Sequence, residues 1–466
     1  MSRVPLCDRP EGWPDLAEAT RVWARIAALS FGGPAGQIAV MHRILVEERR
    51  WLGDGRFLHA LNFCMLLPGP EAQQLAVHIG WLMHGVRGGV IAGVLFVLPG
   101  VAAIMALSWI YALFGEVGFV AGLFFGIKAA VLAIVLQAVV RVGRRALRSG
   151  AMRAVAALSF LAIFVFGAPF PLIVLAAGVI GMLGARAGVP GLTPGTGYGP
   201  EGGAQIVDAD TLLGAEMAAM PAAARRGARL AGLCALALWL LPVAALLLLA
   251  PGSVFAEIAL FFSKLAVVTF GGAYAVLAYV AQEAVATHGW LMPGEMLDGL
   301  GMAETTPGPL IMVVQFVGFL GAWRGSGWDN ALWAGTLGGL LATWVTFAPC
   351  FAFIFFGAPH LERLRASRAL GAALAAVTAA VVGVILNLAV WFWIHTVWTR
   401  TQRFELGPLS LDLPVAGAID PAAAALSALA LLAVFWLRLG MGSVLAAGAL
   451  LGLALHAAGL LAATSG

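Results

Sequence analysis

SFGGPAGQIAV at residues 30–40 and TFGGAYAVLAY at residues 269–279 are two copies of one motif, separated by 239 positions. The same register then holds without a gap through two further shared groups: Trp51-Leu52 with Trp290-Leu291, and Pro68-Gly69-Pro70 with Pro307-Gly308-Pro309. From Phe31 to Pro70, thirteen of forty positions are identical at this offset. The chain therefore contains an internal repeat.

The composition around these motifs excludes a water-soluble protein. Hydrophobic residues make up 61% of the 466 positions and charged residues only 11%, whereas soluble domains carry about a quarter charged residues. The net charge is +4, but the basic residues fall in short loops between apolar runs, where they indicate membrane orientation and not nucleic-acid binding. The four cysteines are scattered and form no CxxC pair, so we expect no metal site and no cofactor.

Apolar runs predict an all-α polytopic membrane protein with about thirteen transmembrane helices. The predicted spans are 22–41, 57–83, 88–114, 117–140, 152–167, 169–185, 230–250, 254–282, 295–322, 329–357, 369–397, 421–437 and 440–462. Glycine and proline interrupt the first, second and ninth spans, so these three are either full crossings or re-entrant segments.

The arginines predict the orientation. With thirteen crossings, eighteen arginines lie on the side of the N-terminus and seven on the other side, which indicates a cytoplasmic N-terminus and an external C-terminus in a bacterial-type inner membrane. The predicted units are an N-terminal repeat at 1–187, a Gly/Pro-rich cytoplasmic linker at 188–228, a connecting transmembrane helix at 229–252 and a C-terminal repeat at 253–466. We expect the linker to be flexible.

Seven predicted crossings separate the starts of the two repeats, and an odd number points the repeats in opposite directions across the membrane. Inverted repeats are typical of secondary transporters, which bind substrate near mid-membrane between broken helices. The alternative is a duplicated scaffold without a transport role.

The only two lysines, Lys128 and Lys264, lie inside apolar stretches, where a lysine costs about 3 kcal/mol unless it meets a partner, a cavity or an anion. Lys264 matches Arg25 at the repeat offset, which suggests a pseudo-symmetric positive site. The alternative is that these side chains extend to the membrane surface.

The FGG and PGP motifs predict breaks in four helices, because glycine permits bends and proline cannot donate a helical hydrogen bond. Backbone N–H groups freed at such breaks can bind an anion. Small-residue motifs also serve tight helix packing, which is the competing interpretation. We expect the substrate site to include Arg25, Ser30, Phe31, Gly32, Gly33, Pro68, Gly69, Pro70, Gln73, Gln74, Lys128, Lys264, Thr269, Gly271, Gly272, Thr305, Thr306, Pro307 and Gly308.

A polar stripe follows the first PGP motif, because Glu71, Gln74 and His78 share one helix face. The second repeat places its acid before the motif, at Glu304. Glu71 and Glu304 are therefore candidate proton carriers, and a static pair between a glutamate and a lysine is the alternative.

With these motifs in order, the chain resembles the chromate ion transporter family in its long, two-repeat form. The likeness rests on FGGPAGQ at Phe31, LLPGPEAQQLAVHIGW from Leu66, TFGGAY at Thr269 and ETTPGPL at Glu304. It implies export of chromate, with sulfate as a second substrate, and chromate resistance. It also adds Pro34 and Pro309 to the functional motif positions, although Ala273 replaces the proline after the second FGG.

Three other functions stay open. A sulfate or other oxyanion permease and an anion channel both fit the composition. A membrane-bound reductase is disfavoured, because no GxGxxG loop or haem CxxCH motif is present, and we expect no enzymatic activity. The expected partners are the oxyanion and the lipid bilayer, and the sequence leaves a homodimer open.

Overall fold

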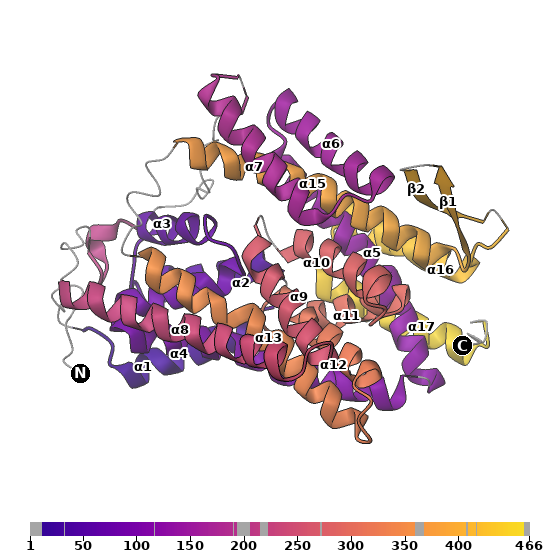
Figure 1. The fold of residues 1–466 in the computed structure, drawn as a ribbon, viewed down its shortest axis with the longest axis horizontal. Helices are drawn as coiled ribbons and strands as arrows, with labels where there is room; N and C mark the ends of the chain where they lie inside the picture. The colour runs from indigo at the N-terminus through magenta and orange to yellow at the C-terminus, as the bar shows by residue number, and fades with distance from the viewer. Residues whose placement is uncertain are drawn as a thin grey trace.

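The computed structural model of the chain describes residues 12–31, 33–115, 117–189, 191–192, 206–214, 222–270, 273–358, 368–406, 409–415 and 417–460. The described chain is almost entirely helical (Figure 1). A short antiparallel hairpin is formed by β1 (Thr401–Leu406) and β2 (Leu409–Pro414), with Thr401 opposite Pro414.

The first FGG motif lies at the tip of a helical hairpin. Helix α1 (Leu16–Leu29) ends before the motif, and α2 (Gly33–His42) begins within it and continues as the π-helix η1 (Arg43–Glu48). The second arm runs back along the first, because Arg49 Nη1 donates to Glu18 Oε1 at 3.1 Å.

The first PGP motif lies at the tip of a second hairpin. Its arms are α3 (Asp54–Cys64) and the first part of α4 (Glu71–Phe114). Helix α4 reverses at His84 and Gly85, where the backbone is not helical and Gly85 has φ 62°. Gly80 then lies against Gly88, so the parts 71–83 and 86–114 are antiparallel helices.

The second half of the chain repeats this order. Helix α9 (Val254–Val268) pairs with α10 (Ala273–Gln282) and the π-helix η3 (Glu283–Thr287), and α11 (Pro293–Thr305) pairs with η4 (Leu310–Met312) and α12 (Val313–Gly325). The arms fold back in both hairpins, since His288 Nδ1 lies 3.7 Å from Glu257 Oε2 and Arg324 Nη2 lies 2.6 Å from Glu295 Oε1. The predicted spans 22–41, 57–83, 254–282 and 295–322 are therefore each two antiparallel helices.

Longer helices complete each half. Helices α5 (Gly118–Ala146), α8 (Ala222–Leu249), α13 (Ala331–Gly357) and α15 (Arg368–Val397) are long and apolar enough to cross a membrane, as is α4. Two shorter helices end each half in sequence. They are α6 (Gly150–Phe166) and α7 (Phe170–Arg186) in the first half, and α16 (Pro421–Phe435) and α17 (Met441–Ala457) in the second.

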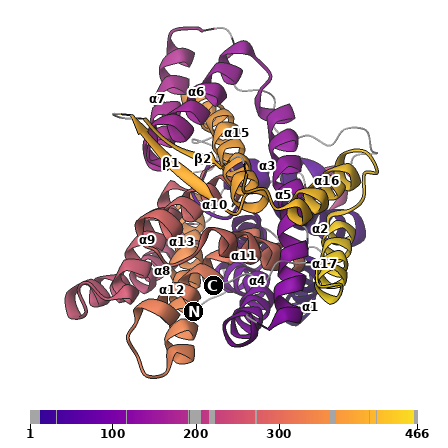
Figure 2. The same ribbon diagram turned by 90° about the vertical axis from the view of Figure 1, so that its right-hand side faces the viewer.

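The two halves exchange these final helices. Helices α6 and α7 pack on α15 of the second half, and α16 and α17 pack on α5 of the first half (Figure 2). Glycines allow the close approach, because a Cβ on Gly181 would meet the Ala372 carbonyl and one on Gly452 would meet the Gly122 carbonyl. The exchange is reciprocal, since each half receives two helices from the other.

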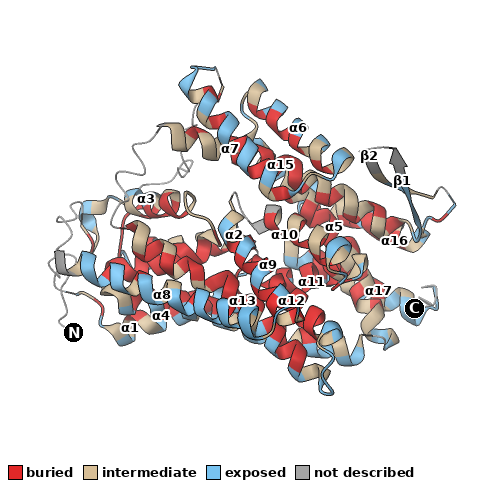
Figure 3. Ribbon diagram, in the orientation of Figure 1, coloured by how far each residue is buried: buried red, intermediate tan, exposed pale blue. Residues whose placement is uncertain are grey.

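Part of the predicted linker is docked on the first half. Ile206 N donates to Asp54 Oδ2 at 2.6 Å, and Leu212 N and Leu213 N donate to the carbonyls of Arg50 and Trp51. The predicted flexibility therefore does not extend to residues 206–214, and residues 193–205 and 215–221 lie outside the described chain. Buried residues gather where the hairpins meet, whereas α8 lies at the edge with most of its surface exposed (Figure 3).

Candidate functional site

The tips of the hairpins meet through two matched backbone hydrogen bonds. Gly69 N donates to the Thr269 carbonyl at 2.9 Å, and Gly308 N donates to the Ser30 carbonyl at 2.9 Å. Both bonds join the PGP motif of one half to the residue before the FGG motif of the other half. The four motifs therefore form one junction between the repeats.

Glycine is required at the centre of both PGP motifs. Gly69 has φ 118° and Gly308 has φ 108°, a region that residues with a Cβ rarely adopt. A Cβ on Gly69 would lie 3.0 Å from Cys350 Sγ, and one on Gly308 would lie 3.0 Å from Gly100 Cα. Cys350 and Gly100 each follow a proline inside a long helix. The same contact, between a PGP glycine and the residue after a helix proline, is therefore made once in each half.

Polar side chains hold the turns in place. Gln37 donates from Nε2 to the Gly308 carbonyl, Gln74 Nε2 donates to the Pro68 carbonyl at 2.6 Å, and Tyr274 Oη donates to Glu304 Oε1 at 2.6 Å. A small cavity of about 20 Å³ lies among the tips. Its lining residues are Pro34, Gln37, Gly69, Pro70, Glu71, Ala72, Thr269, Pro309, Leu310 and Ile311.

Helix N-termini surround this junction. Helices α2 and α10 begin at the FGG motifs, and α4 and η4 begin directly after the PGP motifs without a side-chain cap. Their first N–H groups and positive dipole ends favour an anion. The carbonyls of Ser30 and Thr269 at the ends of α1 and α9 already accept hydrogen bonds from Gly308 N and Gly69 N.

Several buried polar atoms near the motifs have no hydrogen-bond partner among the described residues. They are Gln37 Oε1, both polar atoms of Gln73, Gln74 Oε1, His78 Nδ1 and Glu304 Oε2. An unpaired buried polar group is costly, at about 1–3 kcal/mol each. Such groups are typical of a site that binds a ligand or water.

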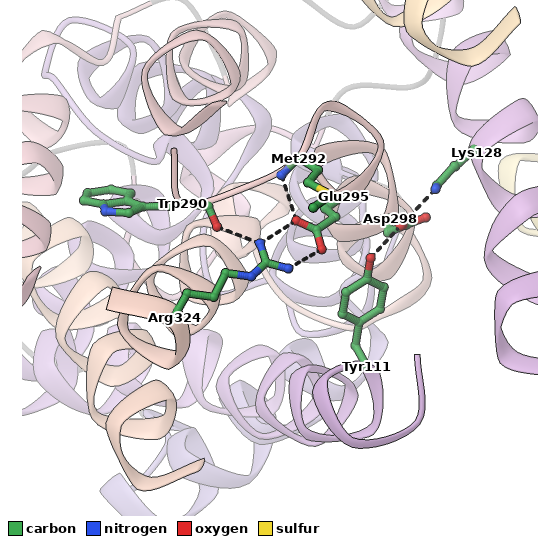
Figure 4. A network of polar contacts seen from close by, with 7 residues as sticks. All are labelled: Tyr111, Lys128, Trp290, Met292, Glu295, Asp298 and Arg324. Carbon is green, nitrogen blue, oxygen red and sulfur yellow. Dashed lines mark hydrogen bonds and ion pairs between the residues drawn. The ribbon is translucent and has the colours of Figure 1, made fainter. Parts of the chain in front are cut away.

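The predicted cationic residues do not line the tip cavity. Arg25 is half exposed and pairs with Glu48 at 2.8 Å, and Lys264 is exposed on α9. Lys128 pairs with Asp298 Oδ2 at 3.2 Å, and Tyr111 Oη donates to the same oxygen at 2.9 Å (Figure 4). The predicted pseudo-symmetric pair of Arg25 and Lys264 is thus not brought to the junction.

The structure places the other predicted residues around the tips. Phe31 is 46% exposed and Thr269 is buried, while Gly32, Gly271 and Gly272 lie outside the described residues. Thr305 and Thr306 donate to carbonyls of α11, including Gly301 and Ala303, so they cap the end of that helix. The predicted polar stripe is buried, with Gln74 and His78 inside and Glu71 at the cavity.

Sequence reasoning missed Gln37, Tyr274, Tyr111 and Asp298. Gln37 and Tyr274 lie within the quoted FGG motifs, so their place in a repeated motif was an available signal. Tyr111 and Asp298 gave no such signal, because neither position is shared between the repeats.

Comparison with known proteins adds an independent finding. The sequence model of the family described as chromate transporter matches residues 17–182 and 256–453. The chromate transport protein of Pseudomonas aeruginosa is 33% identical over 379 residues, which cover 81% of this chain and 80% of that protein. The chromate transport protein of Cupriavidus metallidurans is 26% identical over 389 residues, covering 80% and 82%.

A shorter relative matches only part of the chain. The uncharacterized transporter YwrB of Bacillus subtilis is 28% identical over 119 residues, which cover 26% of this chain and 60% of that protein. No solved structure matches the chain.

Proposed function

The chain belongs to the chromate transporter family, and from this premise we propose that it exports the chromate dianion from the cytoplasm by alternating access. The dianion binds where the FGG and PGP tips meet. The observation that carries this proposal is the convergence of the N-termini of α2, α4 and α10 at the junction, where the nearby carbonyls of Ser30 and Thr269 are already paired.

The hairpins support an inverted arrangement of the repeats. Each hairpin returns to the side from which it enters, so the starts of the two repeats are separated by α4 after its turn, α5, α6, α7 and α8. Five crossings are an odd number, and the second repeat enters from the opposite side. The whole chain then has nine crossings and four re-entrant hairpins.

The distribution of arginines supports this topology. The carbonyls of Arg50 and Trp51 bond to residues 212 and 213 of the linker, so the loop between the first two hairpins lies on the linker side. Arg43, Arg49, Arg50 and Arg56 therefore join the linker side. Only Arg324, Arg400 and Arg403 stay on the opposite side, which fits a cytoplasmic N-terminus and an external C-terminus in the cytoplasmic membrane.

Alternating access is required because the tip cavity is too small for a tetrahedral oxyanion and holds at most about one water. The tips must separate to admit the substrate. Export of a dianion from an inside-negative cell gains about 4.6 kcal/mol per 100 mV, twice the single-charge value. Glu71 at the cavity and Glu304 beside Tyr274 are the proton carriers in this proposal.

Uptake of labelled chromate into inside-out vesicles tests the proposal, because uptake there corresponds to export from the cell. We expect saturable, potential-dependent uptake in vesicles that contain the protein and none in control vesicles. Flux that does not saturate indicates a channel, and uptake of sulfate in preference to chromate indicates a sulfate permease. Conversion of chromate without accumulation indicates a reductase.

A further inference from the structure

The ion pair between Lys128 and Asp298 joins the two repeats. Lys128 lies on α5 of the first repeat and Asp298 on α11 of the second, with Nζ and Oδ2 3.2 Å apart (Figure 4). The ion pairs of the hairpins, such as Arg25 with Glu48 and Arg324 with Glu295, each lie within one repeat. The pair of Lys128 and Asp298 therefore depends on how the repeats sit against each other.

Burial makes the pair sensitive to that arrangement. The Asp298 side chain is 2% exposed, and its Oδ1 has no partner among the described residues. The Lys128 side chain is 29% exposed. A buried carboxylate without its cation is strongly unfavourable, so Asp298 holds α11 against α5 only while Lys128 is in place.

The equivalent positions in the other repeat cannot form this ion pair, because one of them is an uncharged threonine. Asp298 matches His59 at the offset of 239, and Lys128 matches Thr378 at an offset of 250. The second offset also relates Gly122 to Ala372, whose carbonyls face glycines of α17 and α7 in the same way. Helix α11 packs on α5, whereas α3 is not among the described helices that pack on α15, and His59 is exposed.

The FGG hairpins show the same asymmetry. Helix α10 packs on α15, whereas α2 is not among the described helices that pack on α5. Phe31 is 46% exposed, while its equivalent Phe270 packs against the core. The hairpins of the second repeat thus pack on α5 and α15, whereas those of the first repeat pack on α4 and, through Phe63, on Gly357 of α13.

We propose that the α5–α11 contact is the external gate of the transport pathway, closed in this state and latched by Lys128 and Asp298. In this proposal the linker side, between α3 and α15, is where the substrate enters. A dianion that enters from this side competes with Asp298 for Lys128, and the latch opens when Lys128 turns to the anion. This inference rests on the inverted topology and alternating access of the proposed function.

Disulfide trapping tests the gate, because the structure offers a suitable pair of positions. A Cβ on Gly301 would lie 3.7 Å from the Cβ of Ile127, within the range of disulfide bonds. The Ile127→Cys and Gly301→Cys double variant also removes the Ile127 Cγ2 that would obstruct a side chain at position 301. The matched control is Asn62→Cys with Val377→Cys, the equivalent positions, and both are made after replacing the native cysteines by alanine.

We expect the Ile127/Gly301 pair to oxidise in membranes without chromate, and the Asn62/Val377 pair to oxidise several-fold more slowly. Chromate should slow the first reaction and speed the second. Oxidation of the first pair should abolish chromate flux, and a reductant should restore it. Equal oxidation rates without chromate, or full flux through the oxidised first pair, would overturn the gate.

Neutralising Asp298 distinguishes an ion-pair latch from ordinary packing between α5 and α11. In Asp298→Asn we expect a cysteine at Gly294, beside Lys128 Nζ, to react several-fold faster with an impermeant maleimide from outside, and Asp298→Glu should restore slow labelling. The control is Glu295→Gln, which breaks the neighbouring pair with Arg324 inside the second repeat and should leave labelling slow. Equal labelling in both variants would show that Asp298 is not a latch.

These readouts are independent of the substrate. The expected trapping pattern without chromate flux would overturn the proposed function and retain the gate. Chromate flux with identical trapping of both pairs would retain the transporter and overturn the gate.

Discussion

Gly308 and Gly100 are in direct backbone contact, since a Cβ on Gly308 would lie 3.0 Å from the Gly100 Cα. The contact joins the PGP tip of the second repeat to a long helix of the first. Two residues without side chains let the tip reach the backbone that follows Pro99. The centre of the junction therefore tolerates no added carbon at either position.

Gly308→Ala should lower both stability and transport. Its φ of 108° strains an alanine by at least 1–2 kcal/mol, and the contact with Gly100 adds to this cost. The control is Gly289→Ala, where φ is 63° but no atom lies within 4 Å of the added carbon. Thermal unfolding in detergent and chromate flux should fall more for Gly308→Ala, and equal losses would contradict a packed junction.

Replacing Gln74 should affect stability, and replacing Gln73 should affect chromate binding. Gln74→Leu removes the bond to the Pro68 carbonyl and should lower unfolding free energy by about 1–3 kcal/mol. The polar atoms of Gln73 have no partner among the described residues, so Gln73→Leu removes an unpaired buried amide and should raise stability, while it raises the KM for chromate. A stable Gln73→Leu variant with an unchanged KM would remove Gln73 from the substrate site.

Chromate binding should strengthen as pH falls, because the Glu71 carboxylate lines the cavity and repels a dianion until it is protonated. Glu71→Gln mimics the protonated acid and should bind chromate equally well across the pH range. Binding titrations at several pH values measure this. Persistent pH dependence in Glu71→Gln, with its loss in Glu304→Gln, would move the proton carrier to Glu304.

The three cationic residues that the sequence placed in the substrate site should not contribute equally to chromate binding. Lys128→Ala should raise the KM for chromate at least tenfold, because this lysine can turn from Asp298 to the anion. Lys264→Ala and Arg25→Ala should change the KM less than twofold, since Lys264 is exposed on α9 and Arg25 is half exposed and paired with Glu48. A large effect of Lys264→Ala would place the anion nearer α9.

Cysteine labelling should show that the first hairpins are re-entrant. Arg49→Cys and Asp210→Cys should both react with an impermeant reagent only from the cytoplasmic side, because Arg49 and the docked linker are neighbours. Asn330→Cys should react only from outside. Labelling of Arg49→Cys from outside would restore thirteen single crossings.

Much of the fold follows from the repeat. The offset of 239 relates the four hairpins correctly in pairs, and apolar runs locate α5, α13 and α15. Apolar length alone does not distinguish a crossing from a hairpin, because two short antiparallel helices need as many apolar residues as one span. The reversal at Gly85 was located, because it falls between the predicted spans 57–83 and 88–114.

The site was harder to predict than the fold. The tips were found because FGG and PGP are rare and repeated, and the structure joins them through Gly69 and Gly308. The partner of Lys128 was not found, because Asp298 is distant in sequence and has His59 at the equivalent position. An ion pair between residues of different repeats leaves no pattern in the local sequence of either residue.

The exchange of terminal helices has a consequence for biogenesis. While the ribosome is still translating the second half, α5 has already entered the membrane but lacks α16 and α17, which cover one of its faces. At about 5–20 residues per second, this face stays open to the insertion machinery for on the order of half a minute. A membrane chaperone that shields small-residue helix faces would therefore act on nascent α5, and a first half synthesised alone would mature only when a separately made second half is supplied.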